Sequence, residues 1–369
     1  MRTLKNFEVK DKRVLVRCDF NVPLDEEGNI AKRTLSSSLS SFPPEPKILD
    51  DFRIKQTLPT IEYLIGKGAK VILMSHLGRP EGKVVESLKL TPIQNRLMEY
   101  LDYNPPATYI SKAPDCVGEE IEKWSREMQP GEILLLENLR FYKEEEGNNE
   151  GFARKLAKLG DIYINDAFSV CHRNHASIVG IPKYLPSGAG FLLEKEVKVL
   201  SQIIKNPKRP LVVIIGGSKV EDKAKVAERF FGIAKFLLLG NLIAKERIKE
   251  KKSKKIFLPA DSKENLDIGE KTIKIFKEKI FQAKTIFWTG PLGKIEEKKY
   301  QKGTREIAKA IVDSGAFSVI GGGDTVEFIN KIGLIEKFNH VSIGGGAMLA
   351  FLAGEKLPGL EILKNGTKN

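Results

Sequence analysis

RPLVVIIGGSKVEDK, residues 209–223, contains the pattern that predicts the fold of this chain. The run LVVII is continuously apolar, which is typical of a strand buried on both faces. It ends in two glycines, and a helical pattern follows. Glycines let the backbone come close to a phosphate, and a helix N-terminus presents free N–H groups to it. The segment therefore predicts a strand, a phosphate-binding loop and a helix in succession.

The same succession of apolar run and helical pattern recurs along the chain. The first half contains RVLVRCDF (13–20), AKVILMSH (69–76), GEILLLENLRF (131–141) and DIYINDAF (161–168). The second half also contains KFLLLG (235–240), TIFWTG (285–290), FSVIGGG (317–323) and HVSIGGG (340–346). Strands that alternate with helices indicate parallel sheets covered on both faces. We therefore predict an α/β protein of two doubly wound, Rossmann-like parallel-sheet domains.

The length of 369 residues also suggests two domains, at roughly 100–200 residues per domain. The pattern over residues 191–206 predicts an interdomain helix, a natural place for a hinge. We expect domains over residues 1–188 and 189–354, and a flexible surface loop in the serine-rich segment 33–46.

Composition bounds the functional classes. No apolar run reaches the roughly 18 residues of a membrane span, and MRTLKNFEVKDKR lacks the apolar core of a signal peptide. Three widely spaced cysteines favour a reducing cytoplasm over a disulfide framework.

The net charge of +13 suits a small anionic ligand. The lysine-rich run 245–255 admits a nucleic-acid patch, but without interleaved aromatic residues we interpret it as a solvated surface and expect no nucleic-acid partner.

Basic and polar residues follow the expected strands of the first half. These residues are Asp19, Asn21, Arg53, His76, Arg79, Arg140 and Arg173. Ligands of open parallel sheets bind beyond the carboxyl ends of the strands, and arginine binds phosphate and carboxylate through paired hydrogen bonds. Surface salt bridges are the alternative for each single arginine. Cys171, His172 and His175 lack the fourth ligand typical of a zinc site.

Glycine-rich loops follow three expected strands of the second half, at 216–223, 321–325 and 344–348. Lys219 and Lys223 lie four residues apart, so they share a helix face if the helix starts early. Asp324 lies at a helix start, where an N-cap and a Mg²⁺ ligand are both open interpretations. Neither G-x-x-x-x-G-K-[ST] nor G-x-G-x-x-G occurs, which disfavours a P-loop NTPase and a typical dinucleotide dehydrogenase.

With both sets of residues in place, the chain resembles the phosphoglycerate kinase family from about residue 13 to residue 358. The motifs that carry the resemblance are RCDFNVP, SHLGRP, LLENLRF, GGSKVEDK, WTGPLG, GGGDT and HVSIGGGA, in the family's order and spacing. The resemblance implies transfer of a phosphoryl group between 1,3-bisphosphoglycerate and MgADP, giving 3-phosphoglycerate and MgATP. It also implies a cytoplasmic monomer that closes by hinge bending.

The resemblance also assigns residues. The implied phosphoglycerate-binding residues of domain 1–188 are Asp19, Phe20, Asn21, Arg53, His76, Leu77, Gly78, Arg79, Arg140 and Arg173. The implied nucleotide-binding residues of domain 189–354 are Gly217, Lys219, Lys223, Glu296, Gly322, Gly323, Asp324 and Thr325. Arg53 and Lys219 are the expected catalytic residues, and Asp324 is the expected Mg²⁺ ligand. The segment of about 355–369 is expected to pack back on the first domain.

Several positions depart from the family pattern. Thr289 replaces an asparagine, Ile343 replaces a threonine, and a glycine triplet is reduced to Leu239–Gly240–Asn241. The stretch 258–287 is also shorter than usual. These departures leave the nucleotide base open and keep two rival hypotheses in view: a nucleotide-binding pseudo-enzyme, and a kinase for another small acid.

Overall fold

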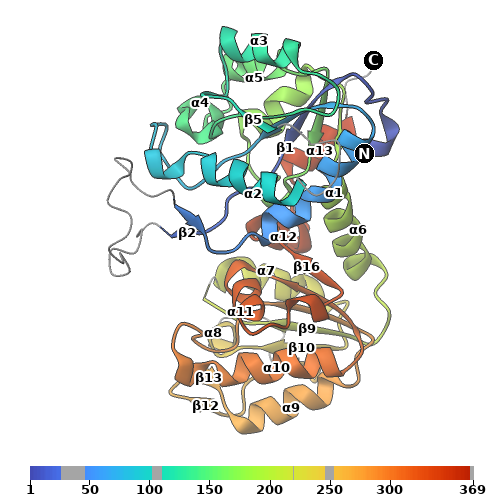
Figure 1. Cartoon of the computed structure of the whole chain (residues 1–369). Coiled ribbons are helices and arrows are strands. Elements are labelled where there is room, and N and C mark those ends of the chain that lie inside the picture. Colours follow the sequence, from blue (N-terminus) through green and yellow to red (C-terminus); the bar gives the residue numbers. More distant parts are fainter. Residues whose placement is uncertain (26–45, 102–109, 219, 246–252, 366–369) are drawn as a thin grey trace, which may run out of the picture. The chain divides into compact units, whose positions relative to one another are not determined.

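The computed structural model describes residues 1–25, 46–101, 110–218, 220–245 and 253–365 (Figure 1). The chain divides into two compact units. The first contains Met1–Glu194 and the C-terminal segment from Pro358, and the second contains Lys195–Leu357. Most of the serine-rich segment, most of the lysine-rich run and Lys219 lie outside the described residues.

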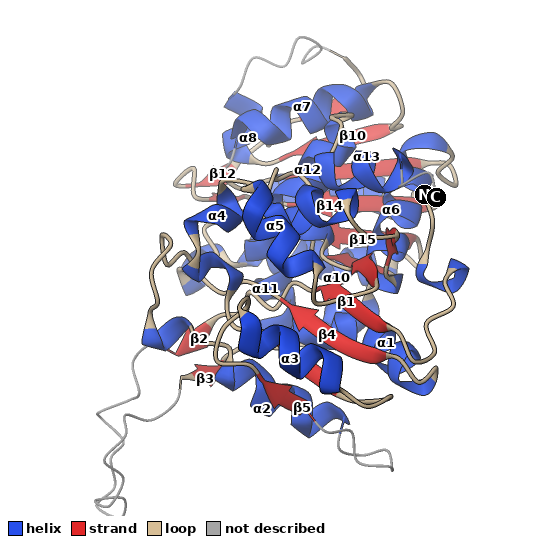
Figure 2. Cartoon of the chain, turned by 90° about the horizontal axis from the view of Figure 1, so that it is seen from above, coloured by secondary structure: helices blue, strands red, loops and turns tan. Residues whose placement is uncertain are grey.

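The first unit is built on a six-stranded sheet whose strand order is β5-β6-β4-β1-β7-β8. All its neighbouring strands are parallel, and β4 lies beside β1 with α1 next to it (Figure 2). The strands are β1 Arg13–Arg17, β4 Lys70–Met74, β5 Ile110–Lys112, β6 Ile133–Leu135, β7 Ile162–Asn165 and β8 Ser187–Ala189. The chain thus extends the sheet on one side of β1 and then on the other.

Helices and a short hairpin complete the first unit. Its helices are α1 Phe52–Gly66, α2 Thr91–Leu101, α3 Glu119–Glu127, α4 Lys143–Glu146, α5 Glu150–Ala157 and α13 Pro358–Asn365, and its hairpin is β2 Leu24–Asp25 with β3 Lys47–Ile48. Valines of β1 and β4 pack with apolar residues of α1 and α2 in one core. Helix α13 returns to this unit, where Gly359 N donates to Cys171 O at 2.9 Å.

Helix α6, Phe191–Lys205, crosses the division between the two units in the sequence. Its start is fixed by a buried carboxylate of the first unit, because Asp166 Oδ1 accepts from Leu192 N at 2.9 Å and from Leu193 N at 3.1 Å. Free N–H groups at a helix start need such acceptors. The helix predicted over 191–206 is therefore present, one residue shorter.

The second unit repeats the architecture with a six-stranded parallel sheet of order β11-β10-β9-β14-β15-β16. Its strands are β9 Leu211–Ile215, β10 Phe236–Leu239, β11 Ile256–Phe257, β14 Thr285–Thr289, β15 Phe317–Gly321 and β16 His340–Ser342. Its helices are α7 Val220–Phe231, α8 Asn241–Lys245, α9 Glu270–Ile280, α10 Lys302–Asp313, α11 Gly323–Lys331 and α12 Gly346–Ala353, and its hairpin is β12 Ser262–Lys263 with β13 Asp267–Ile268.

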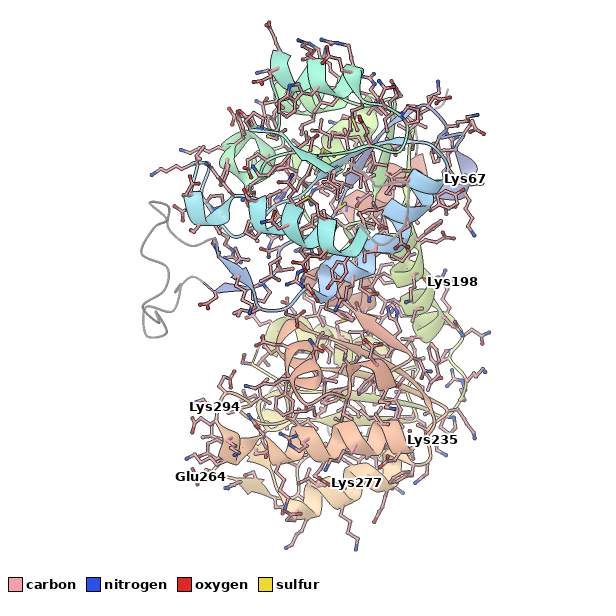
Figure 3. All side chains as sticks on the ribbon, viewed as in Figure 1. Lys67, Lys198, Lys235, Glu264, Lys277 and Lys294 are labelled. Carbon is pink, nitrogen blue, oxygen red and sulfur yellow. The ribbon has the colours of Figure 1, made fainter. Side chains whose placement is uncertain are left out.

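The fold prediction is confirmed. Each of the nine apolar runs quoted from the sequence contains a strand of one of the two parallel sheets. Charged side chains such as Lys67 and Lys235 point outward from the units that carry them (Figure 3). In the part of the chain that the structure describes, no helix has the length and apolar character needed to cross a membrane.

Candidate active site

The predicted basic residues of the first unit follow neighbouring strands of its sheet. Asp19 and Asn21 follow β1, His76 and Arg79 follow β4, and Arg140 follows β6. Arg173 follows β7, and Arg53 lies in the first turn of α1. We call these seven residues the basic cluster. Because β6, β4, β1 and β7 are adjacent in the sheet, their carboxyl ends bring these side chains to one edge.

Asp19 is the anionic centre of the basic cluster. It is only 1% exposed, and its Oδ2 accepts from both the Arg53 guanidinium and the Ser169 hydroxyl. Its Oδ1 accepts from Asn21 N at 3.1 Å. Burial would raise the pKa of Asp19, but Arg53 and these hydrogen bonds outweigh it and lower the pKa to about 2. The carboxylate is therefore ionised and fixes Arg53.

The loop after β4 is fixed by two other members of the cluster. Gly78 N donates to Asn21 Oδ1 at 2.8 Å, and Gly78 O accepts from the Arg140 guanidinium at 2.8 Å. Gly78 has a φ of +64°, a conformation that glycine adopts without strain. Leu77 N donates to Asn138 Oδ1 at 3.2 Å, and Phe20 N donates to Ser75 Oγ at 2.9 Å. These bonds hold the backbone of the cluster before any ligand arrives.

Exposure separates the arginines of the cluster. Arg79 and Arg173 are exposed, and neither takes part in an ion pair with any residue that the structure describes. Arg140 lies 3.2 Å from Glu146, between its Nε and a carboxylate oxygen, and burial lowers the pKa of Arg140. The salt-bridge alternative thus holds for Arg53 and Arg140, whereas Arg79 and Arg173 present their guanidinium groups to solvent and to anions.

Two residues next to the cluster were missed by the sequence analysis. Arg17, the last residue of β1, is fully buried and its guanidinium lies 3.1 Å from His76 Nδ1. Ser169 donates to Asp19. The signal for Arg17 was present, since a charge inside a strand buried on both faces needs partners. No sequence signal distinguishes Ser169 from other loop serines.

In the second unit, the loop that contains Gly216 and Gly217 packs closely against the backbone at Gly290. A Cβ atom on Gly216 would lie 2.9 Å from Gly290 O, so no larger residue fits there. Gly217 and Gly290 have φ values of +77° and +81°. Lys223, in the first turns of α7, is buried, and its Nζ would lie 2.7 Å from a Cβ on Gly290. The loops therefore bring the Lys223 ammonium group close to the backbone of Gly217 and Gly290.

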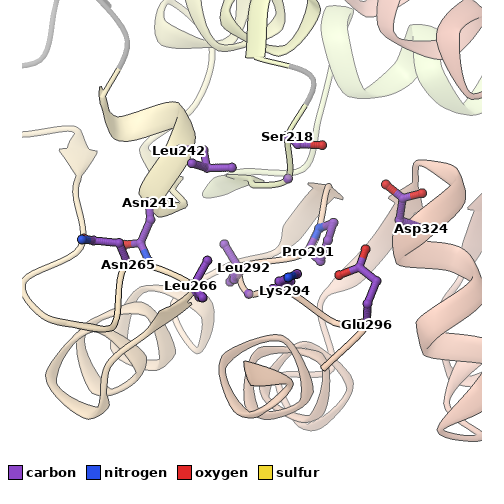
Figure 4. Close-up of a pocket in the computed structure, with 12 residues that line it drawn as sticks. Ser218, Asn241, Leu242, Asn265, Leu266, Pro291, Leu292, Lys294, Glu296 and Asp324 are labelled. Carbon is purple, nitrogen blue, oxygen red and sulfur yellow. The ribbon is translucent and has the colours of Figure 1, made fainter. Parts of the chain in front are cut away.

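A cavity of about 300 Å³ lies next to these loops. We call it the glycine-rich pocket. It is lined by Gly217, Ser218, Asn241, Leu242, Asn265, Leu266, Pro291, Leu292, Gly293, Lys294, Glu296 and Asp324. The carboxylates of Glu296 and Asp324 lie at one end, and Asn241 and Leu242 lie at the other (Figure 4). An apolar wall with polar groups at its ends is typical of a small-molecule site.

Of the predicted nucleotide residues, Gly217, Glu296 and Asp324 line this pocket. The N-cap of α11 is Gly322, and Asp324 lies in the first turn with its side chain exposed. The N-cap interpretation of Asp324 is therefore wrong. Lys219 lies outside the described residues, so the structure does not place its side chain.

The pocket fits a Mg²⁺ ion that arrives with a nucleotide. Mg²⁺ binds through one or two carboxylates together with substrate phosphates, and keeps several waters. Asp324 supplies an exposed carboxylate at the start of a helix beside the pocket. No group of three or more His, Cys, Asp or Glu residues gathers within the described ranges, Cys171, His172 and His175 included. The carboxylate donor set suits a metal shared with phosphates.

Two buried hydroxyls stand beside the same loops. Thr289 Oγ1 and Thr325 Oγ1 are buried and have no hydrogen-bond partner among the described residues. Thr289 Oγ1 would lie 3.1 Å from a Cβ on Gly322. Buried polar groups are normally paired, so these hydroxyls are available to a ligand or to water at the loop 321–325.

The other departures from the family pattern have local roles. Asn241 Nδ2 donates to Asp267 O at 3.0 Å, which ties α8 to the hairpin below the pocket. Ile343 N donates to the buried Glu196 of α6 at 2.8 Å, and the same carboxylate lies 3.0 Å from His340 Nε2. Ile343 therefore contributes a backbone donor to Glu196, and its side chain is buried.

Comparison with known proteins identifies the family. The chain matches the family model for phosphoglycerate kinase over residues 4–256 and 241–355. A phosphoglycerate kinase of Coprothermobacter proteolyticus is 40% identical over 407 aligned positions, 98% of each chain. One of Borrelia garinii subsp. bavariensis is 41% identical over 414 positions, 99% of each chain.

Solved structures agree. The phosphoglycerate kinase from Coxiella burnetii superposes with a TM-score of 0.79 at 32% identity, covering 98% of each chain. That from Pyrococcus horikoshii OT3 gives 0.80 at 32% identity, covering 99% of this chain and 98% of the other. With both parallel sheets, the glycine loops and these relatives in agreement over nearly its whole length, the chain belongs to the phosphoglycerate kinase family.

Proposed function

We propose that the basic cluster binds 3-phosphoglycerate or 1,3-bisphosphoglycerate, and that the glycine-rich pocket binds ATP or ADP with Mg²⁺. Membership of the family makes the chain a glycolytic phosphotransferase that acts on phosphoglycerate and ATP or ADP. The observation that carries the residue assignment is the separation of the two groups: fixed positive charge at strand ends of one unit, and glycine loops beside a pocket in the other.

In the basic cluster, exposed guanidinium groups meet the acid. Arg79 and Arg173 present paired N–H donors to a phosphate or carboxylate, and each charge-assisted bond contributes about 1.5–3 kcal/mol. Asp19 and Asn21 hold Arg53 and the loop after β4 in place. The basic cluster therefore favours a small acid with a negative group at each end, because both groups can pair with cations in the same site.

In the second unit, the nucleotide phosphates lie against glycine backbone and helix starts. Gly217, Gly322 and Gly323 let the backbone approach, and Thr325 and Lys223 supply a buried hydroxyl and an ammonium group. Glu296, exposed at the pocket edge, accepts from the ribose hydroxyls. Asp324 would hold Mg²⁺, and the ion would supply positive charge to the nucleotide phosphates.

The chemistry needs no general base. The attacking oxygen belongs to a carboxylate or a diphosphate, and both are already ionised. Catalysis then consists of positioning and of stabilising the negative charge on the transferring group. Arg53 meets its equatorial oxygens from the acid side, and Lys219 meets them from the nucleotide side. Both side chains carry N–H donors and no acceptor.

Direct transfer requires the two bound substrates to come into contact. The proposal therefore includes closure of the units on the helix α6 when both substrates are bound, which excludes water from the reaction. Small-angle scattering checks this part, because the radius of gyration should fall only with both ligands present. An unchanged radius would argue against closure.

The family also suggests a monomer that works in the cytoplasm. All three cysteines are buried and free of disulfides, which suits a reducing compartment. Sedimentation velocity on the full chain tests the oligomeric state, and a dimer at micromolar concentration would rule out the monomer.

A coupled assay with 3-phosphoglycerate and either ATP or GTP tests the proposed function. We expect turnover that depends on Mg²⁺. Asp324→Asn should raise the Mg²⁺ concentration needed for half-maximal rate, whereas Asp313→Asn, at the exposed end of α10, should leave it unchanged. Absence of turnover with both nucleotides would favour a pseudo-enzyme. Turnover only with another phosphorylated acid would favour a different kinase.

A further inference from the structure

Arg17 is a charged residue that the proposed mechanism does not yet use. Its side chain is fully buried, and its guanidinium is bonded to protein on three sides. Nε donates to Ser177 Oγ at 2.9 Å, one terminal nitrogen donates to Cys18 O, and the other lies 3.1 Å from His76 Nδ1. A group so enclosed does not reach a substrate, so its effect must pass through a neighbour.

The contact with His76 fixes where the imidazole carries its proton. A guanidinium has only donors, so the nitrogen it faces must be an acceptor. His76 Nδ1 is therefore unprotonated, and a neutral imidazole then carries its single proton on Nε2. His76 is 4% exposed and packs under the carboxyl end of β4.

The groups around His76 oppose a second proton. Burial lowers the pKa of His76 well below its usual range, and the cations Arg17, Arg140 and Arg53 add to this effect. Asp19 is the anion that acts in the other direction, and it does not compensate. Protonation would place an N–H of His76 against an N–H of Arg17. Both the charges and the hydrogen-bond geometry thus favour one neutral form.

Arg17 is itself held in this orientation from its other end. Ser177 Oγ, which accepts from Arg17 Nε, donates to Glu145 Oε1 at 2.5 Å, and Ser177 N donates to Glu145 Oε2 at 2.9 Å. Glu145, on α4, is fully buried. The hydrogen bonds that link Glu145 to Ser177 and Ser177 to Arg17 allow the guanidinium a single orientation. In this orientation a terminal N–H is directed at His76.

We infer that Arg17 is a positioning residue, which keeps His76 as the neutral Nε2–H tautomer so that His76 offers the acid substrate one hydrogen-bond donor and no transferable proton. The inference rests on the proposed role of the basic cluster. His76 then orients the substrate through one directional hydrogen bond, while the arginines attract it by their positive charge. Its donor capacity stays constant from pH 5 to pH 8, where an ordinary histidine titrates.

Long-range ¹H–¹⁵N correlation spectra of the full chain with ¹⁵N-labelled histidine test the inference. The chain has four histidines, so the spectrum is simple, and His76→Gln identifies the resonances of His76. Without substrate, we expect one protonated Nε2 and one unprotonated Nδ1 for His76, unchanged from pH 5 to pH 8. A protonated Nδ1, or titration of His76 in this range, overturns the inference without any variant.

Arg17→Met tests the cause. We expect mixed tautomers or titration of His76, together with a KM for 3-phosphoglycerate about tenfold higher and a kcat changed much less. Arg13→Met is the matched control, because it removes an arginine at the other end of β1, where it pairs with Asp161, and leaves Arg17 and its contact with His76 in place. Parental spectra and kinetics in folded Arg17→Met would overturn the inference. If Arg17→Met does not fold, the pH series on the parent chain decides.

Addition of 3-phosphoglycerate separates the two proposals. A shift of the His76 Nε2 resonance on saturation supports the whole account. If His76 is the Nε2–H tautomer but its Nε2 resonance does not change when 3-phosphoglycerate is added, the proposed acid site and the contact between His76 and the substrate are overturned. The effect of Arg17 on the tautomer would still stand.

Discussion

Asp19 of the first unit and Asp267 of the second lie equally deep in the protein, each 1% exposed, but in opposite electrical surroundings. Asp19 is paired with Arg53 and accepts a hydrogen bond from Ser169, and these partners outweigh burial so that its pKa is about 2. Burial raises the pKa of Asp267 to about 6, although the backbone amides of Gly303 and Ile268, each at 2.9 Å, and the charge of Lys263 act in the other direction.

This difference extends to the two sites. The basic cluster is held together by charged side chains that bind one another before a substrate arrives. The glycine-rich pocket is shaped by backbone, and its carboxylates Glu296 and Asp324 are exposed. Substitutions in the first unit should therefore affect stability and binding together, whereas substitutions at the pocket edge should affect binding alone.

Arg53→Ala should give the largest effect. It removes the guanidinium that we place on the transferring group, so kcat should fall by about 10²–10³-fold, as for other lost transition-state donors. Steady-state assays with both substrates saturating measure this. Arg126→Ala on α3, an exposed residue paired with Glu122, is the control and should retain parental kcat. A kcat near the parental value in Arg53→Ala would remove Arg53 from the mechanism.

Asp19→Asn should alter acid stability. A pKa lowered from 3.8 to about 2 contributes stability that is fully present above about pH 4 and is lost as the pH falls toward 2. The contribution is about 2 kcal/mol. The variant should be less stable than the parent at pH 6, and the difference should shrink as the pH falls. Thermal melts from pH 2 to pH 6 measure it, and a constant difference would contradict the charge pairing.

Asp267→Asn should show the opposite pH dependence of stability, with a smaller effect. A raised pKa means that ionisation destabilises the fold, so the parent loses stability as the pH rises from about 4 through 6. The variant loses one side-chain oxygen that accepts from a backbone N–H, so it starts less stable than the parent at pH 4. Its deficit in melting temperature should narrow above pH 6. A deficit that widens over this range would show that Asp267 has a cationic partner in solution.

The sequence was sufficient for the fold because both sheets consist of continuous apolar runs that end in glycine or polar residues. It did not reveal β5, β8 and β11, which are only two or three residues long and depend on their neighbours for pairing. The hairpin that brings Asn265 and Leu266 to the pocket was also missed, since its strands have two residues each.

For the site, sequence positions at strand ends were sufficient to group the basic cluster, but not to give the contacts within it. Arg17 meets His76 and Ser177 across 59 and 160 positions of sequence, and only the packed sheet brings them together. The N-cap hypothesis for Asp324 failed because the N-cap is Gly322, two residues earlier, and α11 begins at Gly323. Helix starts are among the least certain features of a sequence pattern.

Each unit is expected to bind one substrate, and isothermal titration calorimetry on variants of two exposed residues tests this expectation. Arg79→Ala should weaken binding of 3-phosphoglycerate about tenfold or more and leave MgADP unchanged, because one charge-assisted contact is lost. Glu296→Ala should do the reverse. Arg126→Ala should bind both ligands as the parent does. If either variant loses affinity for the other unit's ligand, or for both ligands equally, the assignment of the two sites is wrong.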